Sequence, residues 1–320
     1  MKQLKNSHIL GIGSLDSDDI DLIIEASFIC KKILAQSSRK LDALKGRTVV
    51  NLFYESSTRT RSSFEIAEKR LSAEVLNFAS STSSVTKGET LVDTVRNLQS
   101  MAPDIIVIRH SSSGAPHLLT RICRASVINA GDGMHEHPTQ AFLDAVTIME
   151  KRKSLRGLKI AICGDIRHSR VARSDIMLFS RLGAQVWVCG PPTLIPIGIE
   201  SIGCQVTYQM DEAVEGADVV MGLRIQQERL KEAFFPSIKE YFQLYGLTVD
   251  RLQKASRNVL VMHPGPMNRG VEIDSEVADG PYSVILDQVT NGVAARMAIL
   301  YLIAGKTLEE LRKEADETAD

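Results

Sequence analysis

The stretch FYESSTRTRSSFE, residues 53–65, indicates how this chain folds. It follows the apolar run Thr48–Phe53, which predicts a strand, and it leads into a segment whose apolar residues recur at helical spacing. These apolar residues are Phe64, Ala67 and Leu71. A strand that runs directly into a helix, with Ser57 or Thr58 as a natural N-cap, is the repeating unit of parallel sheets covered by helices.

The start of this predicted helix is suited to binding an anion. The first N–H groups of a helix have no partner inside the helix, and the helix dipole is positive at that end. The hydroxyl and guanidinium groups of residues 56–61 can complete the shell around a phosphate. We therefore expect a phosphate-bearing substrate here. A capped surface helix with solvated arginines is the alternative.

The same alternation of short apolar runs and helical patterns extends along the chain. Strands are expected at Thr48–Phe53, Glu74–Phe78, Asp104–Arg109, Ser126–Ala130, Lys159–Cys163, Gln185–Cys189, Gln205–Tyr208, Asp218–Met221 and Asn258–His263. Helices are expected at Asp18–Gln36 with Ser17 as N-cap, Ser62–Ser72, Glu89–Met101, Pro116–Arg124, Pro138–Lys151 and Ser169–Leu182. Ligands of such sheets bind beyond the carboxyl ends of the strands, and most polar motifs of this chain lie there.

This alternation predicts an α/β fold with two doubly wound parallel-sheet domains. The polar stretch 151–157 marks the boundary, so the first domain spans 1–150 and the second 151–287. An apolar helix at about 288–305 has more apolar surface than an isolated tail would expose, so it is expected to pack back across a domain interface. The charged residues Leu308–Asp320 are expected to fray.

Composition excludes several classes of partner. The chain has 320 residues, with 38 Lys and Arg against 39 Asp and Glu, so it has no basic field for nucleic acid or for an acidic membrane. No apolar run approaches the ~20 residues that span a bilayer, and the first ten residues do not resemble a signal peptide. Five cysteines without a CxxC pair favour reduced thiols and a cytoplasmic protein.

Two further positions are suited to the same anion. Arg109 ends a predicted strand, where its guanidinium can provide a second ligand. Lys87 follows the Ser- and Thr-rich stretch 80–86, whose composition predicts a loop suited to closing over a phosphate. Taken alone, each is more often an ordinary surface side chain.

The motif DGMHEHPTQ, residues 132–140, follows another strand and ends at a helix start. The imidazole of His137 and the amide of Gln140 suit hydrogen bonding to a planar carbonyl-amide group. His135 and His137 form a His-x-His pair, but zinc sites need three or four protein ligands and no partner motif is evident. We therefore predict no metal here; a plain capping loop stays open as the alternative.

The second half of the chain offers positive charge after two strands. The segment after Lys159–Cys163 lacks the GxGxxG pattern, which argues against NAD or FAD, but it contains Arg167 and Arg170. Arg224 follows a later strand, and two separate arginine sites suit a substrate with two carboxylates. In the motif HPGP, residues 263–266, prolines remove N–H donors and leave carbonyls to accept from an amine. Solvated arginines and a structural turn are the alternatives.

Taken together, these motifs resemble those of aspartate carbamoyltransferase catalytic chains, and they occur in the family's order over nearly the whole chain. The motifs that carry the resemblance are FxExSTRTR at 53–61, KGET at 87–90, DGxxxHPTQ at 132–140, GD at 164–165 with Arg170, RxQxER at 224–229 and HPGP at 263–266. One position varies: some members have leucine where this chain has Gly265, and others have the glycine.

The resemblance implies transfer of a carbamoyl group from carbamoyl phosphate to L-aspartate, a step of pyrimidine biosynthesis, with no cofactor and no metal. It implies a carbamoyl-phosphate-binding domain at 1–150, to which the C-terminal helix returns, and an aspartate-binding domain at 151–287. It also implies a homotrimer with active sites shared between subunits. A regulatory chain or a dihydroorotase is a possible further partner.

The resemblance also implies roles for individual residues. The expected phosphate ligands are Ser57, Thr58, Arg59, Thr60 and Arg109, and the expected catalytic residues are Arg59, Thr60, Arg109 and His137. Of these, Thr60, Arg109 and His137 would contact the carbamoyl oxygen, and Gln140 would take the amide. Ser83 and Lys87 would come from the neighbouring chain. The aspartate site would comprise Lys87, Arg170, Arg224, Gln226 and the backbone at Gly265 and Pro266.

Other functions fit the sequence less well. An ornithine carbamoyltransferase should contain DxxxSMG and HCLP, which are absent, and a variant acting on a modified ornithine is a related alternative. A catalytically inactive homologue that serves as a scaffold should have lost part of the phosphate motif, whereas 57–60 is complete. A nucleotide-binding dehydrogenase lacks its glycine pattern.

Overall fold

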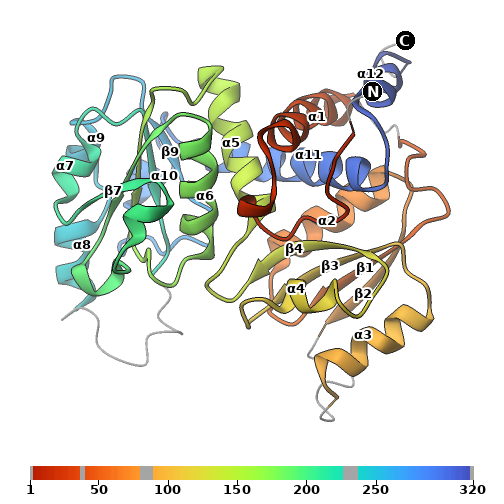
Figure 1. The fold of residues 1–320 in the computed structure, drawn as a ribbon. Coiled ribbons are helices and arrows are strands. Elements are labelled where there is room, and N and C mark those ends of the chain that lie inside the picture. The colour runs from red at the N-terminus through yellow and green to blue at the C-terminus, as the bar shows by residue number, and fades with distance from the viewer. Residues whose placement is uncertain (1–2, 37–39, 80–88, 226–236, 318–320) are drawn as a thin grey trace. The chain divides into compact units, whose positions relative to one another are not determined.

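The computed structural model describes residues 3–36, 40–79, 89–225 and 237–317 (Figure 1). The chain forms two compact units. Unit 1 comprises 1–146 together with 289–320, and unit 2 comprises 147–288. The chain passes into unit 2 within helix α5 (Pro138–Arg152) and returns within α11 (Ile285–Ile303).

Unit 1 contains a four-stranded parallel sheet in the order β2-β1-β3-β4. Its strands are β1 (Thr48–Phe53), β2 (Glu74–Ala79), β3 (Ile105–His110) and β4 (Ser126–Asp132). Its other helices are η1 (Ile12–Ser14), α1 (Ser17–Ala35), α2 (Thr58–Arg70), α3 (Leu91–Ser100), α4 (Ala115–Leu119) and α12 (Leu308–Glu317).

Both faces of this sheet are covered, as the continuous apolar runs of a parallel sheet require. On one face, apolar residues of β1, β3 and β4 pack against α3 and α4, with Val95, Leu98 and Leu119 buried there. Figure 1 shows α1, α2 and α11 on the opposite side of the sheet. The predicted strands and the α/β fold class are thus confirmed for this half of the chain.

Unit 2 contains a five-stranded parallel sheet in the order β7-β6-β5-β8-β9. Its strands are β5 (Lys159–Cys163), β6 (Gln185–Cys189), β7 (Cys204–Thr207), β8 (Val219–Gly222) and β9 (Leu260–Met262). Its helices are α6 (Arg170–Arg181), η3 (Pro192–Leu194), η4 (Ile199–Ile202), α7 (Met210–Val214), α8 (Ile238–Tyr245), α9 (Val249–Leu252) and α10 (Ser275–Ala278). The second predicted sheet is therefore also confirmed.

Several predicted helix bounds differ from the structure: α3 begins at Leu91 and not at Glu89, and α4 spans Ala115–Leu119 and not Pro116–Arg124. Helix α1 begins at Ser17, and its N-cap is Asp16, whose carboxylate accepts a hydrogen bond from Asp19 N at 2.9 Å. The predicted N-cap of α2, Ser57, is confirmed, but the predicted range Ser62–Ser72 began four residues too late: the helix begins at Thr58, and Arg61 N already donates to Ser57 O. Its first turn is polar, so apolar spacing could not reveal it.

The expectation that the C-terminal residues fray was wrong for 308–317. Thr307 Oγ1 accepts from Glu310 N, and Glu310 Oε2 accepts from Thr307 N at 2.7 Å, a reciprocal capping box. Leu308 and Leu311 are buried, and Arg312 pairs with Glu25 of α1. Two apolar residues one turn apart therefore hold a largely charged helix against unit 1.

Among the described helices, none combines the length and the apolar character that crossing a membrane requires.

Candidate active site

At the strand-to-helix junction after β1, the N-terminus of α2 has no side-chain capping hydrogen bond among the described residues. Ser57 is the N-cap of α2, with extended backbone, and its side chain accepts no capping hydrogen bond from the described helix. Thr58 and Arg59 are exposed, whereas Thr60 is buried. The hydroxyl of Ser57 is therefore not committed to its own helix, and the positive end of the helix dipole remains directed at an incoming anion.

Arg109 lies next to this junction. In the parallel register it pairs with Phe53, the last residue of β1, so both strands end at the same edge of the sheet. Its Nη1 donates to Ala130 O at 3.3 Å, and its Nε lies 3.5 Å from Glu55 Oε2. With a side chain only 15% exposed, the guanidinium is oriented before any ligand arrives.

His137 and Gln140 lie at the start of α5, directly after the next strand, β4. His137 precedes Pro138 and is buried, and its carbonyl accepts from Gln140 N at 3.0 Å. The side-chain amide of Gln140 donates to both carboxylate oxygens of the buried Asp144, at 3.1 and 3.2 Å. These contacts orient the amide so that its oxygen is the atom left to accept a hydrogen bond from an NH₂ group.

The loop that leads to His137 is held by buried carboxylates. Asp132, at the end of β4, accepts from Asn129 Nδ2 at 2.8 Å and from Glu136 N at 3.1 Å. Glu136 in turn accepts from Ile12 N at 2.7 Å. His137 therefore sits on a backbone that is tied to two other parts of unit 1.

A buried arginine lies behind α2. Arg296 of α11 donates to Ser63 Oγ at 2.9 Å, and its guanidinium lies over the ring of Phe64 at 5.2 Å. Burial lowers the pKa of Arg296 to about 10, and the negative charge of Asp144 opposes that shift. Arg296 therefore stays charged at neutral pH and connects α11 to helix α2.

Unit 2 places two arginines at neighbouring strand ends. Arg170 is the first residue of α6, after the N-cap Ser169, and is largely buried. Arg224 lies two residues beyond β8, and β8 pairs with β5, which leads to α6. Both arginines thus follow the carboxyl ends of adjacent strands, where two carboxylates of a small ligand can be bound.

Gly164 is required at this edge for close approach of the backbone. Its φ is +133°, and a Cβ at this position would lie 2.6 Å from Leu223 O. Its N–H donates to Cys189 O at 2.8 Å. The glycine therefore joins the ends of three strands, a packing role that explains why it occurs without a dinucleotide-binding pattern.

The HPGP turn is fixed by its histidine. His263 Nδ1 accepts from Gly265 N at 2.8 Å, so its Nε2 carries the proton and donates to Glu272 Oε1 at 3.2 Å. Gly265 has φ +67°, a conformation that favours glycine over leucine. Pro266 is exposed. The backbone conformation at Gly265 therefore favours the glycine of this chain over the leucine of some members of the family that its sequence resembles.

Comparison with known proteins identifies the family. The carbamoyl-P binding domain of the aspartate/ornithine carbamoyltransferases matches residues 7–150, and their Asp/Orn binding domain matches 156–303. The aspartate carbamoyltransferase catalytic subunit of Syntrophotalea carbinolica is 58% identical over 94% of this chain and 96% of its own length. That of Desulfosudis oleivorans is 55% identical, over 94% and 97%. The chain belongs to the aspartate/ornithine carbamoyltransferase family.

Solved structures of this family share the fold. Aspartate transcarbamoylase of Trypanosoma cruzi, in complex with carbamoyl aspartate and phosphate, matches with a TM-score of 0.82 at 33% identity, covering 93% of this chain and 96% of that one. Ornithine carbamoyltransferase of Pyrococcus furiosus matches with a TM-score of 0.85 at 28% identity, covering 95% and 99%. Because both acceptor types share the fold, the shape of the backbone alone does not select the acceptor.

Several partners of the predicted site residues in this carbamoyltransferase were missed from sequence. Glu55 lies beside Arg109, and Asp144 orients Gln140. Arg296, which contacts Ser63 of α2, was missed as well. Asp144 had a visible signal, because it lies four residues after Gln140 and thus on the same helix face. Arg296 was the one charge in the predicted apolar helix at about 288–305, which also indicates a buried polar contact.

Three predicted residues, Ser83, Lys87 and Gln226, lie outside the described residues. Arg167, named with Arg170 in the sequence, is exposed, and its Nη1 donates to Thr193 O at 3.4 Å.

Proposed function

We propose that this protein transfers the carbamoyl group of carbamoyl phosphate to the amino group of L-aspartate, giving N-carbamoyl-L-aspartate and phosphate. The observation that carries the proposal is the placement of three side chains at one edge of one parallel sheet: Thr60 after β1, Arg109 as the next-to-last residue of β3, and His137 after β4. The identity of 58% with a protein named as an aspartate carbamoyltransferase catalytic subunit supports aspartate as the acceptor.

Unit 1 binds carbamoyl phosphate in this proposal, which corresponds to the predicted domain 1–150 with the helix at about 288–305. The phosphate lies at the N-terminus of α2, held by Ser57, Thr58, Arg59 and Thr60, with Arg109 beside it. The carbamoyl oxygen accepts from Thr60, Arg109 and His137. The oxygen of the Gln140 amide, oriented by Asp144, accepts from the carbamoyl NH₂.

Unit 2 binds aspartate, which corresponds to the predicted domain 151–287. Arg170 and Arg224 pair with the two carboxylates, helped by Gln226. The carbonyls at Gly265 and Pro266 accept hydrogen bonds from the amine. Two carboxylates and one amine distinguish aspartate from ornithine, which has a single carboxylate and a second amine.

The chemical step needs a neutral amine that attacks the carbamoyl carbon. A C–N bond forms, the carbonyl oxygen gains negative charge, and the C–O bond to phosphate then breaks. Fixed donors stabilise the charged oxygen, each contributing roughly 3 kcal/mol. The amine proton leaves with the phosphate, whose charge is held by the helix N-terminus. Much of the acceleration comes from positioning two small molecules. The step uses no covalent enzyme intermediate.

The proposal includes a homotrimer in which Ser83 and Lys87 of one subunit complete the site of the next. The names of the relatives call them catalytic subunits, which supports a further, non-catalytic chain as a partner. A regulatory chain or a dihydroorotase would fill that place.

The test is turnover with each acceptor. Purified protein is incubated with carbamoyl phosphate and either L-aspartate or L-ornithine, and phosphate and the carbamoylated product are followed. We expect carbamoyl-aspartate and no carbamoyl-ornithine. Turnover with ornithine would refute the acceptor assignment and leave the phosphate site intact. Turnover with neither acceptor would favour an inactive scaffold.

A further inference from the structure

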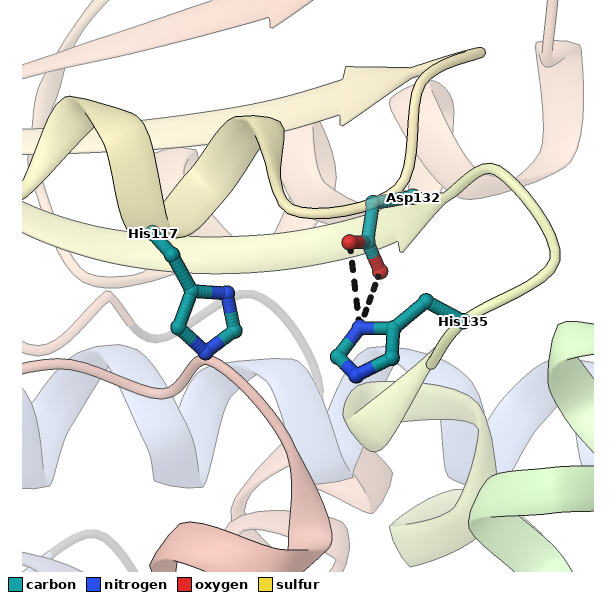
Figure 2. A group of neighbouring side chains, drawn as sticks. All are labelled: His117, Asp132 and His135. Atoms are coloured by element: carbon teal, nitrogen blue, oxygen red, sulfur yellow. Dashed lines mark hydrogen bonds and ion pairs between the residues drawn. The ribbon is translucent and has the colours of Figure 1, made fainter.

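Three side chains that commonly bind metals meet beside the end of β4. His117 belongs to α4, Asp132 ends β4, and His135 lies in the loop before α5 (Figure 2). One ligand atom from each residue lies within 4.8 Å of the other two. None of the three is among the residues proposed to bind carbamoyl phosphate or aspartate.

The spacing is close to that of a metal centre. His135 Nδ1 lies 3.1 Å from Asp132 Oδ2 and 3.3 Å from Oδ1. Two ligands about 2.1 Å from the same ion are separated by roughly 3.0–3.4 Å, the range from octahedral to tetrahedral angles. His117 lies at the surface, with its ring edge-on to that of His135 at 5.7 Å, so a small side-chain rotation completes a set of three.

The surrounding structure fixes the central ligand. Asp132 is buried, and it accepts from Gly114 N at 2.7 Å and from Asn129 Nδ2 at 2.8 Å. Gly114 is the N-cap of α4, so the carboxylate also holds the helix that carries His117. Hydrogen bonds of this kind orient the ligands of natural metal sites.

The loop before α4 and the loop after β4 pack tightly against each other. Gly133 N donates to His110 O at 2.9 Å, and Met134 N donates to Ser113 Oγ at 3.3 Å. A Cβ on Gly133 would lie 2.7 Å from Ser113 N. The loop after β3 and the loop after β4 therefore form one frame, which reduces the entropy that ordering the ligands would cost.

The frame also holds a buried negative charge. The carboxylate of Asp132 lies at the end of β4 with 0% of its surface exposed. A cation beside it compensates a charge that burial makes costly.

We propose that His117, Asp132 and His135 bind one divalent transition-metal ion of the zinc class. Two imidazole nitrogens and one carboxylate oxygen suit Zn²⁺, Co²⁺ or Ni²⁺, whereas Mg²⁺ and Ca²⁺ prefer oxygen ligands alone. Water fills the remaining positions. The ion joins α4 to the loop that leads to His137, so its effect is to brace that loop.

The test uses the full chain after removal of metal by a chelator. Zn²⁺ is titrated in by calorimetry, and thermal unfolding is recorded with and without it. We expect one ion per chain and a higher unfolding midpoint with Zn²⁺. Loss of an outer hydrogen-bond partner already weakens metal sites by ~10–100-fold, so His117→Ala should weaken binding at least tenfold. It should also abolish the rise in midpoint.

The matched control is His8→Gln, which removes a partly buried histidine of the same unit outside the cluster. It should bind Zn²⁺ as the unaltered protein does. Unchanged affinity and stoichiometry in His117→Ala, or no Zn²⁺ binding by the unaltered protein, would overturn the proposal. A second readout is Co²⁺, whose visible spectrum should show nitrogen ligation that is lost in His135→Ala.

Carbamoyl transfer without added metal separates this inference from the proposed function. His117→Ala should keep the rate of the unaltered protein, which also verifies that the variant folds. Failure of carbamoyl transfer in both proteins, with Zn²⁺ still bound by the unaltered chain, would refute the proposed activity and leave the metal site standing.

Discussion

Arg109 is the side chain whose loss should separate chemistry from acceptor binding. It lies at the end of β3 with Glu55 beside it, and in the proposed reaction it donates to the oxygen that gains charge. Removing one such donor typically lowers kcat by about 10²–10³. Arg109→Ala should therefore lower kcat by that factor, while the KM for aspartate changes little. Steady-state kinetics at saturating carbamoyl phosphate measures both.

The control for this variant is Arg121→Ala, which removes an exposed arginine of the same unit. It should leave both constants unchanged. Near-normal kcat in Arg109→Ala would contradict its role in stabilising the transition state.

Glu68 is the basis of a separate prediction about how the stability of the protein depends on pH. It is buried in α2, where Asn51 Nδ2 donates to its Oε2 at 2.8 Å. Burial, partly offset by that hydrogen bond, raises its pKa from 4.5 to about 8. Between those values the folded protein holds a proton that the unfolded chain has released. The contribution of this carboxyl to stability is therefore full below pH ~4.5 and is lost as pH rises through ~8.

Glu68→Gln should remove this pH dependence. At alkaline pH the variant should be more stable than the unaltered protein by on the order of a few kcal/mol, and at about pH 4.5 the difference should vanish. Urea unfolding across this range measures the effect. Glu65→Gln is the control, because Lys69 lowers the pKa of that more exposed carboxyl and gives a small change of opposite sign. An identical pH profile for Glu68→Gln and the unaltered protein would refute the account.

At the scale of residues, the sequence indicated candidate ligand-binding side chains more readily than the side chains that support them. Arg109 and His137 were visible because each follows an apolar run, where strand ends gather polar side chains. Glu55 and Arg296 were not, because their contacts depend on which segments become neighbours in space. His117 was missed as a partner of His135 for the same reason, being 18 residues away along the chain.

At the scale of helices, the most direct prediction concerns the buried arginine of α11 and its contribution to stability. Arg296 is a buried charge that contacts Ser63 of α2 and is balanced by the charge of Asp144. Breaking a buried charge pair by removing one partner lowers stability by about 3–5 kcal/mol. Arg296→Met, which keeps much of the volume, should lower the free energy of unfolding by that amount in urea titrations.

The double variant Arg296→Met with Asp144→Asn supplies the control. If the loss comes from the unpaired carboxylate, the double variant should recover part of it, giving a coupling energy of about 0.5–3 kcal/mol. Additive losses would show that Arg296 acts through packing alone.

Element boundaries were predictable where composition changes sharply. The bounds of β1, β5 and β6 agree with the prediction because apolar runs end there at polar or small residues. Helix α12 was missed although its capping box, Thr307 and Glu310, is legible in the sequence. Most of its residues are charged, so the sequence did not indicate that two leucines, Leu308 and Leu311, are buried and hold the helix in place.

For the molecule as a whole, the alternation of strands and helices was sufficient to predict two parallel sheets. It was not sufficient to predict strand order. In unit 1, β1 lies between β2 and β3, and in unit 2, β5 lies between β6 and β8. Such orders depend on the handedness and packing of each crossover, which no local pattern records.

The proposed trimer yields a prediction about mixtures. If Lys87 and Arg109 of different subunits form one site, the Lys87→Ala and Arg109→Ala proteins should each be nearly inactive. After dissociation and random reassembly at equal amounts, about one quarter of the sites should contain both native residues. Carbamoyl transfer should recover to that level. A mixture that stays inactive would mean that each chain contains its complete site.

The path of the chain through the two units affects how the protein is made. Unit 2 is an insertion, because 147–288 lies between the two segments that form unit 1. On the ribosome, unit 2 is therefore synthesised before the residues of α11 and α12 that complete unit 1. Until then Ser63 and α1 lack their partners, Arg296 and α12. Synthesis of unit 1 thus begins first, but its fold is completed last. Chains that stall near residue 288 expose the apolar surface of unit 1 that α11 and α12 would cover, and this surface promotes aggregation.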